Sequence, residues 1–401
     1  DKIAVHRYRQ EETAGKMPAL RSAGRRSVFV YLPGTNMNGE AALTDEKYNL
    51  WLYLARRGAD VYTLDYRTHF VPSLGVTDFS FMSGWTYHVF LDDVAEAVAL
   101  AKKESGAEGV FLAGFSRGVS LAYLHAAARW KEGLCGLVML DGGLKNPRGT
   151  NAHDLQKARA GLNSFASDVG GRMGWEKRQE LMKKVLEGSA EAANELAQIL
   201  HKAWRPGGLA NPLEGYSDAR VLARLLAGYD RYYPSVQTLE SNALADYDDH
   251  PTLPYDDRLR EVDVPLLVFQ STGMGAQFVL NGFYTAGLLA TTDVTLNLLE
   301  SYGHLDVIAG ERARTEVFEK VRLWLERRQG CSKGRPSAAP SAPANPYGPR
   351  SNRYLGVLSS SHPSGARTKC RPRIHMMHAV PATTKISASR FHIPGPPSVH
   401  P

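Results

Sequence analysis

The chain has 401 residues, 43% of them hydrophobic, and a formal net charge of +7. Its last 71 residues, 331–401, hold ten of the 48 Lys and Arg residues and no Asp or Glu, so the body 1–330 has 38 basic and 41 acidic residues and a net charge of −3. The basic total therefore does not predict nucleic-acid binding by the body, and no run of about 18 apolar residues predicts a transmembrane segment.

The first part of the chain alternates between strand-like and helix-like segments. Residues 3–9 alternate weakly between apolar and polar side chains and predict an edge strand. Apolar runs predict strands at 27–32, 59–64, 109–113 and 136–140. Helical spacing of apolar residues predicts helices at 47–57, 89–103 and 117–130. Regular alternation of this kind indicates a parallel sheet with right-handed crossovers.

One strand-to-helix junction contains a motif with a chemical meaning. Residues 114–118 read Gly-Phe-Ser-Arg-Gly, which fits the pattern G-x-S-x-G between an apolar run and a predicted helix. A sharp turn at this place strains the central residue, Ser116, and lifts its hydroxyl off the sheet, while the glycines let strand and helix approach closely. The alternative is an ordinary strand-to-helix turn that happens to contain a serine.

The alternation of strands and helices stops after residue 144. Helices without a convincing strand are predicted at 177–187, 191–204 and 218–228. The sheet pattern resumes with strands at 264–269 and 294–299, followed by a last helix at 306–328. We therefore predict a core domain of residues 1–144 and 261–330, with 145–260 inserted as a helical cap or lid over the carboxyl edge of the sheet, where open parallel sheets bind ligands.

The tail 331–401 contains 12 of the 22 prolines, and its composition predicts disorder because it cannot bury enough apolar surface. Its scattered basic charges favour a solvated tail over a site for nucleic acid or an anionic surface. Pairing of Cys331 and Cys370 is left open, whereas Cys135 is expected to be a buried hydrophobic residue. The start at Asp1 suggests a removed leader or other N-terminal piece, so an exported protein is possible but no compartment is indicated.

Four features in order resemble the α/β-hydrolase fold family over residues 27–328. They are Leu32-Pro33-Gly34-Thr35 after an early strand, the serine turn at 114–118, a cap between the sixth and seventh strands, and Tyr302-Gly303-His304 after the final strand. Ser116, Asp141 and His304 match the family order of nucleophile, acid and base. The resemblance implies an α/β fold with a mostly parallel sheet flanked by helices, and a serine esterase or lipase-like activity.

The resemblance implies a role for each of these three side chains. A serine hydroxyl is a poor nucleophile at neutral pH, so Ser116 needs a base, and His304 is suited to accept and return the proton. Many relatives have the acid shortly after the seventh strand, but residues 270–276 hold no carboxylate. Some relatives take it from the end of the sixth strand, which favours Asp141, although an Asp before two glycines is also typical of a simple turn.

An oxyanion hole is expected from two backbone N–H groups. By resemblance, one N–H belongs to Arg117 at the start of the helix after the serine turn, and the other belongs to Thr35 in the loop after the strand 27–32. The family often has His-Gly where this chain has Pro33-Gly34, a change that removes a side chain and leaves the backbone donor. The Arg117 side chain is expected either to meet an acidic substrate group or to form a salt bridge with the cap or the sheet rim.

Together these features predict a serine hydrolase that cleaves small-molecule carboxylic esters through an acyl-enzyme. The aromatic segments 79–85 and 229–233 either line an apolar acyl or aryl pocket or seal the cap against the core. No cofactor or metal is expected, because H-E-x-x-H, paired-Cys, G-x-G-x-x-G and Walker patterns are lacking. The alternatives are a peptidase, thioesterase or acyltransferase on the same triad, a non-catalytic binding protein with this fold, and a functional basic tail on a scaffold body.

Overall fold

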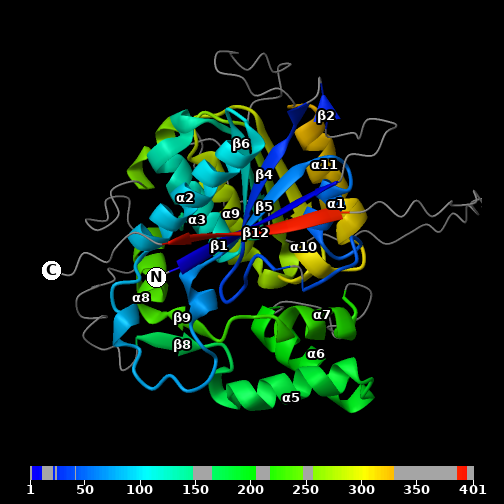
Figure 1. Ribbon diagram of the computed structural model, residues 1–401. Coiled ribbons are helices and arrows are strands. Elements are labelled where there is room, and N and C mark those ends of the chain that lie inside the picture. The colour runs from blue at the N-terminus through cyan, green and yellow to red at the C-terminus, as the bar shows by residue number, and fades with distance from the viewer. Residues whose placement is uncertain are drawn as a thin grey trace, which may run out of the picture.

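A computed structural model of the chain describes residues 2–10, 21–22, 25–40, 42–147, 165–204, 217–246, 256–328 and 386–394. An eight-stranded sheet forms its centre, in the order β11-β10-β7-β6-β4-β5-β1-β12 (Figure 1). These strands are β1 (Lys2–Gln10), β4 (Val28–Leu32), β5 (Asp60–Asp65), β6 (Val110–Phe115), β7 (Leu134–Leu140), β10 (Leu266–Ser271), β11 (Val294–Leu299) and β12 (Ile386–Pro394). The strands from β11 to β5 pair in parallel, and β1 and β12 are antiparallel to their neighbours, which confirms the predicted mostly parallel α/β sheet.

Two separate hydrophobic clusters place helices on both faces of this sheet. One cluster includes helices α2 (Tyr87–Ser105), α3 (Arg117–Arg129) and α9 (Ala276–Gly287), and the other includes α1 (Leu50–Ala55), α10 (Asp306–Ala309), η7 (Arg314–Phe318) and α11 (Glu319–Glu326). Along β4, Val28 and Val30 belong to the first cluster, whereas Phe29 and Tyr31 belong to the second, because successive strand side chains point to opposite faces. No helix within the described ranges is long and apolar enough to cross a bilayer.

The chain between β7 and β10, which we call the insertion, contains the predicted helices and a small sheet that was not predicted. Its elements are β8 (Ala166–Asp168), α5 (Trp175–Leu186), α6 (Ala190–Trp204), α7 (Ala219–Ala227), β9 (Tyr232–Pro234) and α8 (Ser235–Asp246). β8 and β9 pair antiparallel, so the prediction of no strand in this region was wrong. Strands of three residues are too short for an alternation pattern to reveal. In Figure 1, α5, α6, α7, β8 and β9 lie together below the sheet.

Part of the tail is ordered, which corrects the prediction of disorder for residues 386–394. These residues form β12, which pairs with β1 along its whole length, with Phe391 opposite Val5 and Arg390 opposite His6 (Figure 1). β1 is therefore not the edge strand that the sequence predicts. The physical reason is that an open strand edge offers unpaired N–H and C=O groups, which a short extended segment can satisfy whatever the composition of the residues around it. The rest of the tail, 331–385 and 395–401, lies outside the described residues.

Cys135 in β7 is buried, as predicted, but it is not a simple hydrophobic residue. Its sulfur is disulfide-bonded. Spacing along the chain does not show which cysteines pair, because pairing depends on Cα distances that only the fold provides. The other two cysteines, Cys331 and Cys370, lie outside the described residues.

Candidate active site

The bend after β6 holds Ser116 in a strained backbone conformation. Its φ is 54° and its ψ is −118°, in a region that non-glycine residues rarely adopt. The bend is fixed by two backbone bonds, from the Ser116 N–H to the Leu140 carbonyl and from the Val119 N–H to the Ser116 carbonyl, both 3.0 Å long. The Ser116 side chain is partly exposed, and its hydroxyl makes no hydrogen bond to a described residue.

Both glycines of the motif are required by the close approach of three elements. A Cβ on Gly114 would lie 2.2 Å from the Gly118 carbonyl oxygen, and a Cβ on Gly118 would lie 2.1 Å from the Leu32 carbonyl oxygen. Real Cβ atoms do not approach backbone so closely, so any side chain at either position would push β4, β6 and α3 apart. The spacing of the motif thus reflects packing around the bend.

His304, in the loop after β11, lies beside this bend and pairs with Asp141 at the end of β7. The His304 Nδ1 is 2.7 Å from the Asp141 Oδ2. The imidazole stacks on Phe115, the residue before Ser116, with 4.7 Å between ring centroids, and Phe278 meets it edge-on at 5.8 Å. A carboxylate at Nδ1 favours the tautomer with the proton on that nitrogen, which leaves Nε2 as a proton acceptor.

Asp141 is fully buried and is held by Ser271, the last residue of the neighbouring strand β10. The Ser271 N–H donates to the Asp141 Oδ1 over 2.6 Å, and the Ser271 hydroxyl donates to the Oδ2 over 2.7 Å. Residues 270–276 hold no carboxylate, and a role for the serine at the end of this strand was not predicted. The available signal was positional, since the carboxyl ends of adjacent parallel strands meet at the same edge of a sheet.

The two predicted oxyanion-hole positions both lie close to Ser116 along the chain or across the turn after β4. Thr35 belongs to a turn closed by a 3.1 Å bond from the Met37 N–H to the Gly34 carbonyl. A Cβ on Gly34 would be 3.1 Å from the Ser116 Cβ, so this turn touches the serine. Arg117 is the first residue of α3, where backbone N–H groups lack an acceptor within the helix and the helix dipole favours negative charge.

Within the described residues the Arg117 side chain forms no salt bridge, although it does contact the insertion. It donates hydrogen bonds to the Tyr87 hydroxyl at 2.8 Å and to the Gln237 carbonyl of α8 at 3.0 Å. Burial disfavours its charge, but interactions with Tyr233 and Tyr87, whose rings lie against the guanidinium, keep its pKa raised. The side chain therefore ties α3 to the insertion.

The insertion is also fastened to the loop that contains Thr35. The Asn36 side-chain amide donates to the Asp230 carbonyl at 3.0 Å, and the Asp230 N–H donates back to the Asn36 carbonyl at 2.7 Å. The Asn38 amide donates to the Gly228 carbonyl at 2.8 Å. These bonds hold residues 228–230 next to the loop and make the insertion one wall of the region around Ser116.

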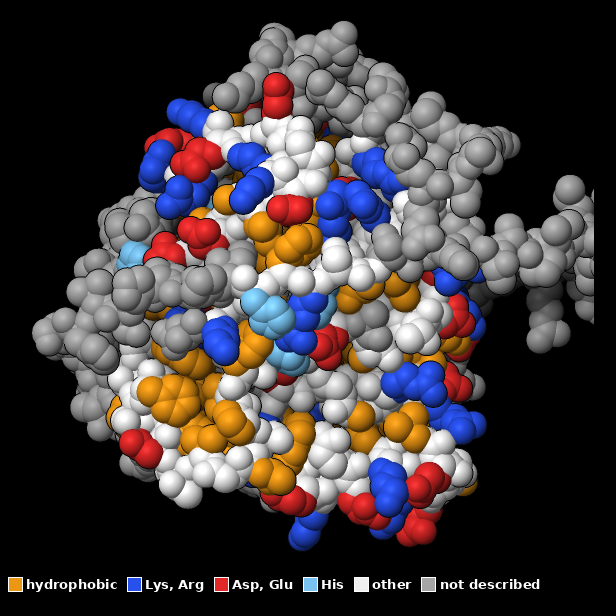
Figure 2. Space-filling view, in the orientation of Figure 1, with side chains coloured by type: hydrophobic (Ala, Val, Ile, Leu, Met, Phe, Trp, Pro, Cys, Tyr) orange, Lys and Arg blue, Asp and Glu red, His pale blue; other side chains and the backbone are white. Residues whose placement is uncertain are grey.

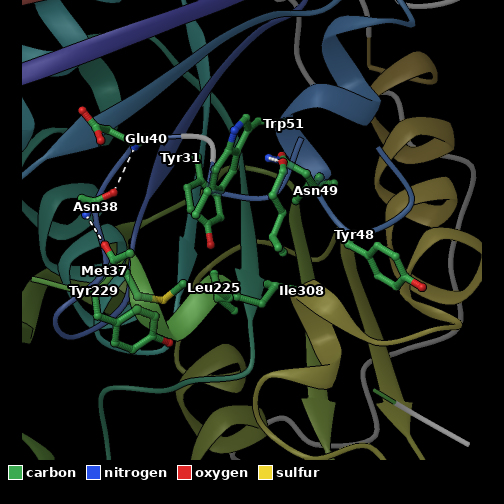
Figure 3. Close-up of a pocket in the computed structure, with 14 residues that line it drawn as sticks. Tyr31, Met37, Asn38, Glu40, Tyr48, Asn49, Trp51, Leu225, Tyr229 and Ile308 are labelled. Atoms are coloured by element: carbon green, nitrogen blue, oxygen red, sulfur yellow. Dashed lines mark hydrogen bonds between the residues drawn. The ribbon is translucent and has the colours of Figure 1, made fainter. Parts of the chain in front are cut away.

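A small pocket lies between the loop after β4, α1 and the insertion. Its walls include Tyr31, Met37, Trp51, Leu225, Tyr229 and Ile308 (Figure 3). Of the two aromatic segments that were expected either to line a pocket or to seal the cap against the core, Tyr229 contributes to these walls. Phe79 and Tyr232 from those segments instead pack on each other, with ring centroids 4.5 Å apart, as the sealing alternative predicts.

A second group of titratable side chains lies at the end of β5, and we call it the Asp65 cluster: His6, Glu40, Asp65, His69, Asp230 and Arg390. Potential ligand atoms of its first three members all lie within 4.8 Å of one another, a set that is able to hold a divalent cation. The Arg390 guanidinium lies against this acidic group, 2.9 Å from the Asp65 Oδ2 and 3.2 Å from the Glu40 Oε1. In Figure 2, pale-blue histidines meet blue and red side chains near the middle of this face.

The charges of the Asp65 cluster shift the pKa values of its members. Burial opposes ionisation of Asp65, but its hydrogen bonds with His6 and Gly39 and the nearby histidines hold its pKa below the usual value. His69 Nδ1 is 2.8 Å from the Asp230 Oδ1, and this contact outweighs burial and raises the His69 pKa. Burial raises the pKa of Asp230 itself.

Comparison with solved structures gives a substantial likeness to a lipase-like protein. A putative lipase from Sulfolobus solfataricus is 28% identical with a TM-score of 0.60, and the match covers 76% of this chain and 87% of that one. Carboxylesterase from the thaumarchaeon Nitrososphaera gargenis (15% identity, TM-score 0.45, 81% and 95% covered) and Paleococcus ferrophilus monoacylglycerol lipase (14%, 0.44, 75% and 95%) are too distant to bear on the chemistry of this chain. No curated protein sequence matches the chain.

The model of one protein family matches the sequence directly. That family is described as the alpha/beta hydrolase family, and the match spans residues 29–264, more than half of the chain. The matched range begins in β4 and ends two residues before β10. It includes Asp141 and the strained bend at Ser116. The parallel sheet, the bend after β6 and this match agree, and the chain therefore belongs to the alpha/beta hydrolase family.

Proposed function

We propose that this protein is a serine hydrolase that cleaves carboxylic esters, with Ser116 as nucleophile, His304 as general base and acid, and Asp141 as the acid that orients the imidazole. The observation that carries the proposal is the 2.7 Å contact between the His304 Nδ1 and the Asp141 Oδ2, beside a serine held at positive φ. The putative lipase that is similar over most of the chain supports an ester substrate.

In this proposal the His304 Nε2 takes the hydroxyl proton as the Ser116 Oγ attacks the ester carbonyl carbon. The N–H groups of Arg117 and Thr35 stabilise the negative oxygen of the tetrahedral intermediate. The imidazolium then returns its proton to the leaving alcohol, and an acyl-enzyme remains. Water, deprotonated by His304, attacks the acyl carbon, and the carboxylic acid leaves as Ser116 regains its proton.

We also propose that residues 145–260 act as a cap on a core domain of residues 1–144 and 261–330. Bonds from Asn36, Asn38 and Arg117 to residues 228–237 support this arrangement, because they join the insertion to both sides of Ser116. Such a cap would exclude water from the acyl-enzyme and select the substrate.

The first test is the hydrolysis of p-nitrophenyl esters from acetyl to palmitoyl, together with labelling by a fluorophosphonate. Ser116→Ala is expected to abolish labelling and to lower turnover at least about 1,000-fold. Ser105→Ala is the matched control, since this serine lies at the far end of α2 and its hydroxyl bonds only to nearby backbone, donating to the Ala101 and Lys102 carbonyls and accepting from the Ala107 N–H. A folded Ser116→Ala protein that is still labelled, or that still hydrolyses the esters, would contradict the proposal. Thioesters and peptide amides assayed in parallel separate the related acyl chemistries.

Asp141→Asn is the second test. We expect kcat to fall about 1,000- to 10,000-fold, because an amide at this position favours the wrong imidazole tautomer. The amide NH2 would also face the N–H or the hydroxyl of Ser271, which both donate to the carboxylate. Near-normal turnover with retained structure would move the acid to another residue.

A further inference from the structure

The loop between β11 and α10 contains His304, and the side chain of Asp306 closes this loop. Asp306 is buried, with 3% of its surface exposed. The Gly303 N–H donates to the Asp306 Oδ2 at 2.6 Å, and the Asp306 N–H donates back to the Gly303 carbonyl at 3.1 Å. His304 lies between these two residues in the sequence, so the two bonds fix the backbone on both sides of the imidazole.

The segment after β10 holds the beginning of the same loop. The Gly273 N–H donates to the Tyr302 carbonyl at 2.8 Å, and the Ser301 N–H donates to the Thr272 Oγ1 at 2.7 Å. Ser301 has a φ of 64°, which marks a sharp change of direction where the loop leaves β11. The loop is therefore anchored to the sheet at its start and closed by Asp306 at its end.

A hydrogen bond from the insertion reaches the same carboxylate. Ser217 directly precedes Asp218, the N-cap of α7, and the buried Ser217 hydroxyl donates to the Asp306 Oδ1. In Figure 1, α7 lies directly below α10, the helix that Asp306 begins. One carboxylate thus accepts from the His304 loop through Oδ2 and from the insertion through Oδ1. To separate the two segments would leave a buried donor without its partner, which costs free energy.

The place of the His304 ring matters because the ring has to serve as both base and acid. Asp141 fixes its Nδ1 at 2.7 Å, and the ring stacks on Phe115 at 4.7 Å. These two contacts orient the ring, whereas the backbone of the loop decides how far the ring stands from Ser116. A misplacement of about 1 Å in a catalytic group can lower a rate about 100-fold.

We propose that Asp306 is a positioning residue for His304, because its carboxylate fixes the loop of the general base and joins that loop to the insertion through Ser217. This inference rests on the proposed ester hydrolysis and adds a residue to it. Asp306 differs from Asp141 in its mode of action. Asp141 contacts the imidazole directly, whereas Asp306 acts through the backbone of Gly303.

The test compares kcat/KM for two esters of one acid, p-nitrophenyl butyrate and ethyl butyrate. Nitrophenolate leaves without a proton, whereas ethanol has to receive one from the His304 imidazolium. A misplaced imidazole therefore slows the ethyl ester more, but a loss of folded protein lowers both values by the same factor. We expect Asp306→Ala to lower kcat/KM about tenfold for the nitrophenyl ester and about 100-fold for the ethyl ester.

Asp60→Ala is the matched control. Asp60 is buried to a similar degree and also accepts hydrogen bonds, from the Arg7 guanidinium. It begins β5, however, and so lies at the edge of the parallel sheet opposite to the edge that holds Ser116. This variant is expected to leave the ratio of the two kcat/KM values as it is in the wild type.

Asp306→Asn is the conservative variant. Its amide oxygen is able to accept from the Gly303 N–H, and its NH2 group is able to donate to the Ser217 hydroxyl. The loop should therefore stay closed, and we expect both kcat/KM values to remain within about threefold of wild type.

Ser217→Ala removes the bond to the insertion and leaves the Gly303 bond in place. We expect kcat/KM for the ethyl ester to fall roughly three- to tenfold, the worth of one hydrogen bond, and the nitrophenyl value to fall less. In the Asp306→Ala background the same substitution should cause no further loss, because the acceptor is already absent.

The outcomes separate this inference from the proposed function. Asp306→Ala that lowers both esters by one factor, or neither, overturns the positioning role, as does an equal change of the ester ratio in Asp60→Ala. If Asp306→Ala does not fold, an unchanged ratio in Ser217→Ala overturns it. Loss of hydrolysis in Ser116→Ala leaves the proposed function standing in each of these cases. Hydrolysis that persists in Ser116→Ala contradicts the proposed function and this inference together.

Discussion

His304 and His69 are both imidazoles whose Nδ1 meets a carboxylate, at 2.7 Å from Asp141 and at 2.8 Å from Asp230. Both lie in segments that follow a strand of the sheet, β11 for His304 and β5 for His69. Their surroundings differ. His304 is enclosed by Phe115 and Phe278, next to the strained bend at Ser116, and the second ring nitrogen has no acidic neighbour among the described residues.

The second nitrogen of His69 faces more negative charge. Its Nε2 is 3.7 Å from Asp65 and 3.9 Å from Glu40, so the ring lies among three carboxylates and its pKa is raised. The His69 imidazole joins the end of β5 to the insertion through Asp230, and its raised pKa favours the cationic form. A histidine–carboxylate contact alone therefore does not identify a catalytic pair, because a nucleophile must also lie beside the imidazole.

Replacement of each histidine by glutamine gives the sharpest contrast. We expect His304→Gln to lower kcat for ester hydrolysis by about 10,000-fold or more, because no other described group beside Ser116 accepts its proton. His69→Gln is expected to keep activity within about threefold. Steady-state hydrolysis of one p-nitrophenyl ester by both variants, with circular dichroism to confirm folding, measures the difference. Equal losses of kcat in the two variants would contradict the assignment of different roles to the two histidine–carboxylate pairs.

Ser271→Ala is expected to lower the activity moderately, because the Ser271 hydroxyl donates a hydrogen bond to Asp141, the partner of His304. Loss of one donor to the Asp141 Oδ2 should lower kcat/KM by roughly three- to tenfold. Ser271→Thr, which keeps the hydroxyl, should restore kcat/KM, and a kcat/KM in Ser271→Ala equal to that of wild type would contradict this role of the Ser271 hydroxyl.

The smallest expected effect concerns the pH dependence of stability at His69. Because its pKa in the folded state is raised above 6.5, its stabilising contribution is full below about pH 6.5 and is lost as the pH rises through the folded-state value. Glu40, Asp65, Asp230 and Arg390 are the charged groups around it, and the raised pKa of Asp230 acts in the same direction.

The measurement is the melting temperature of wild type and His69→Gln at about pH 5.5 and pH 9, with ionic strength held constant. At the lower pH the wild type should melt a few degrees above His69→Gln. This difference in melting temperature between the two proteins should shrink at the higher pH. A difference that grows with pH would contradict the assignment of His69 as a structural cation.

Local patterns predicted the parallel sheet and the serine bend well, because both depend on residues close in sequence. Alternating apolar runs indicated β4, β6, β7 and β10, and two glycines around Ser116 indicated a close strand-to-helix crossing. Local patterns did not predict contacts between segments that lie far apart in the sequence. The pairing of β12 with β1 joins residues almost 400 positions apart, and the composition of the tail contains no sign of it.

Motif spacing and strand alternation are local properties of the chain, so they predict the family framework and the order of Ser116, Asp141 and His304 without coordinates. The contact of Ser271 with Asp141 and the bond from Arg117 to the insertion become visible in the folded chain alone. These contacts join segments that are brought together by sheet order and packing. Their free energy depends on distances and burial that no single stretch of sequence contains.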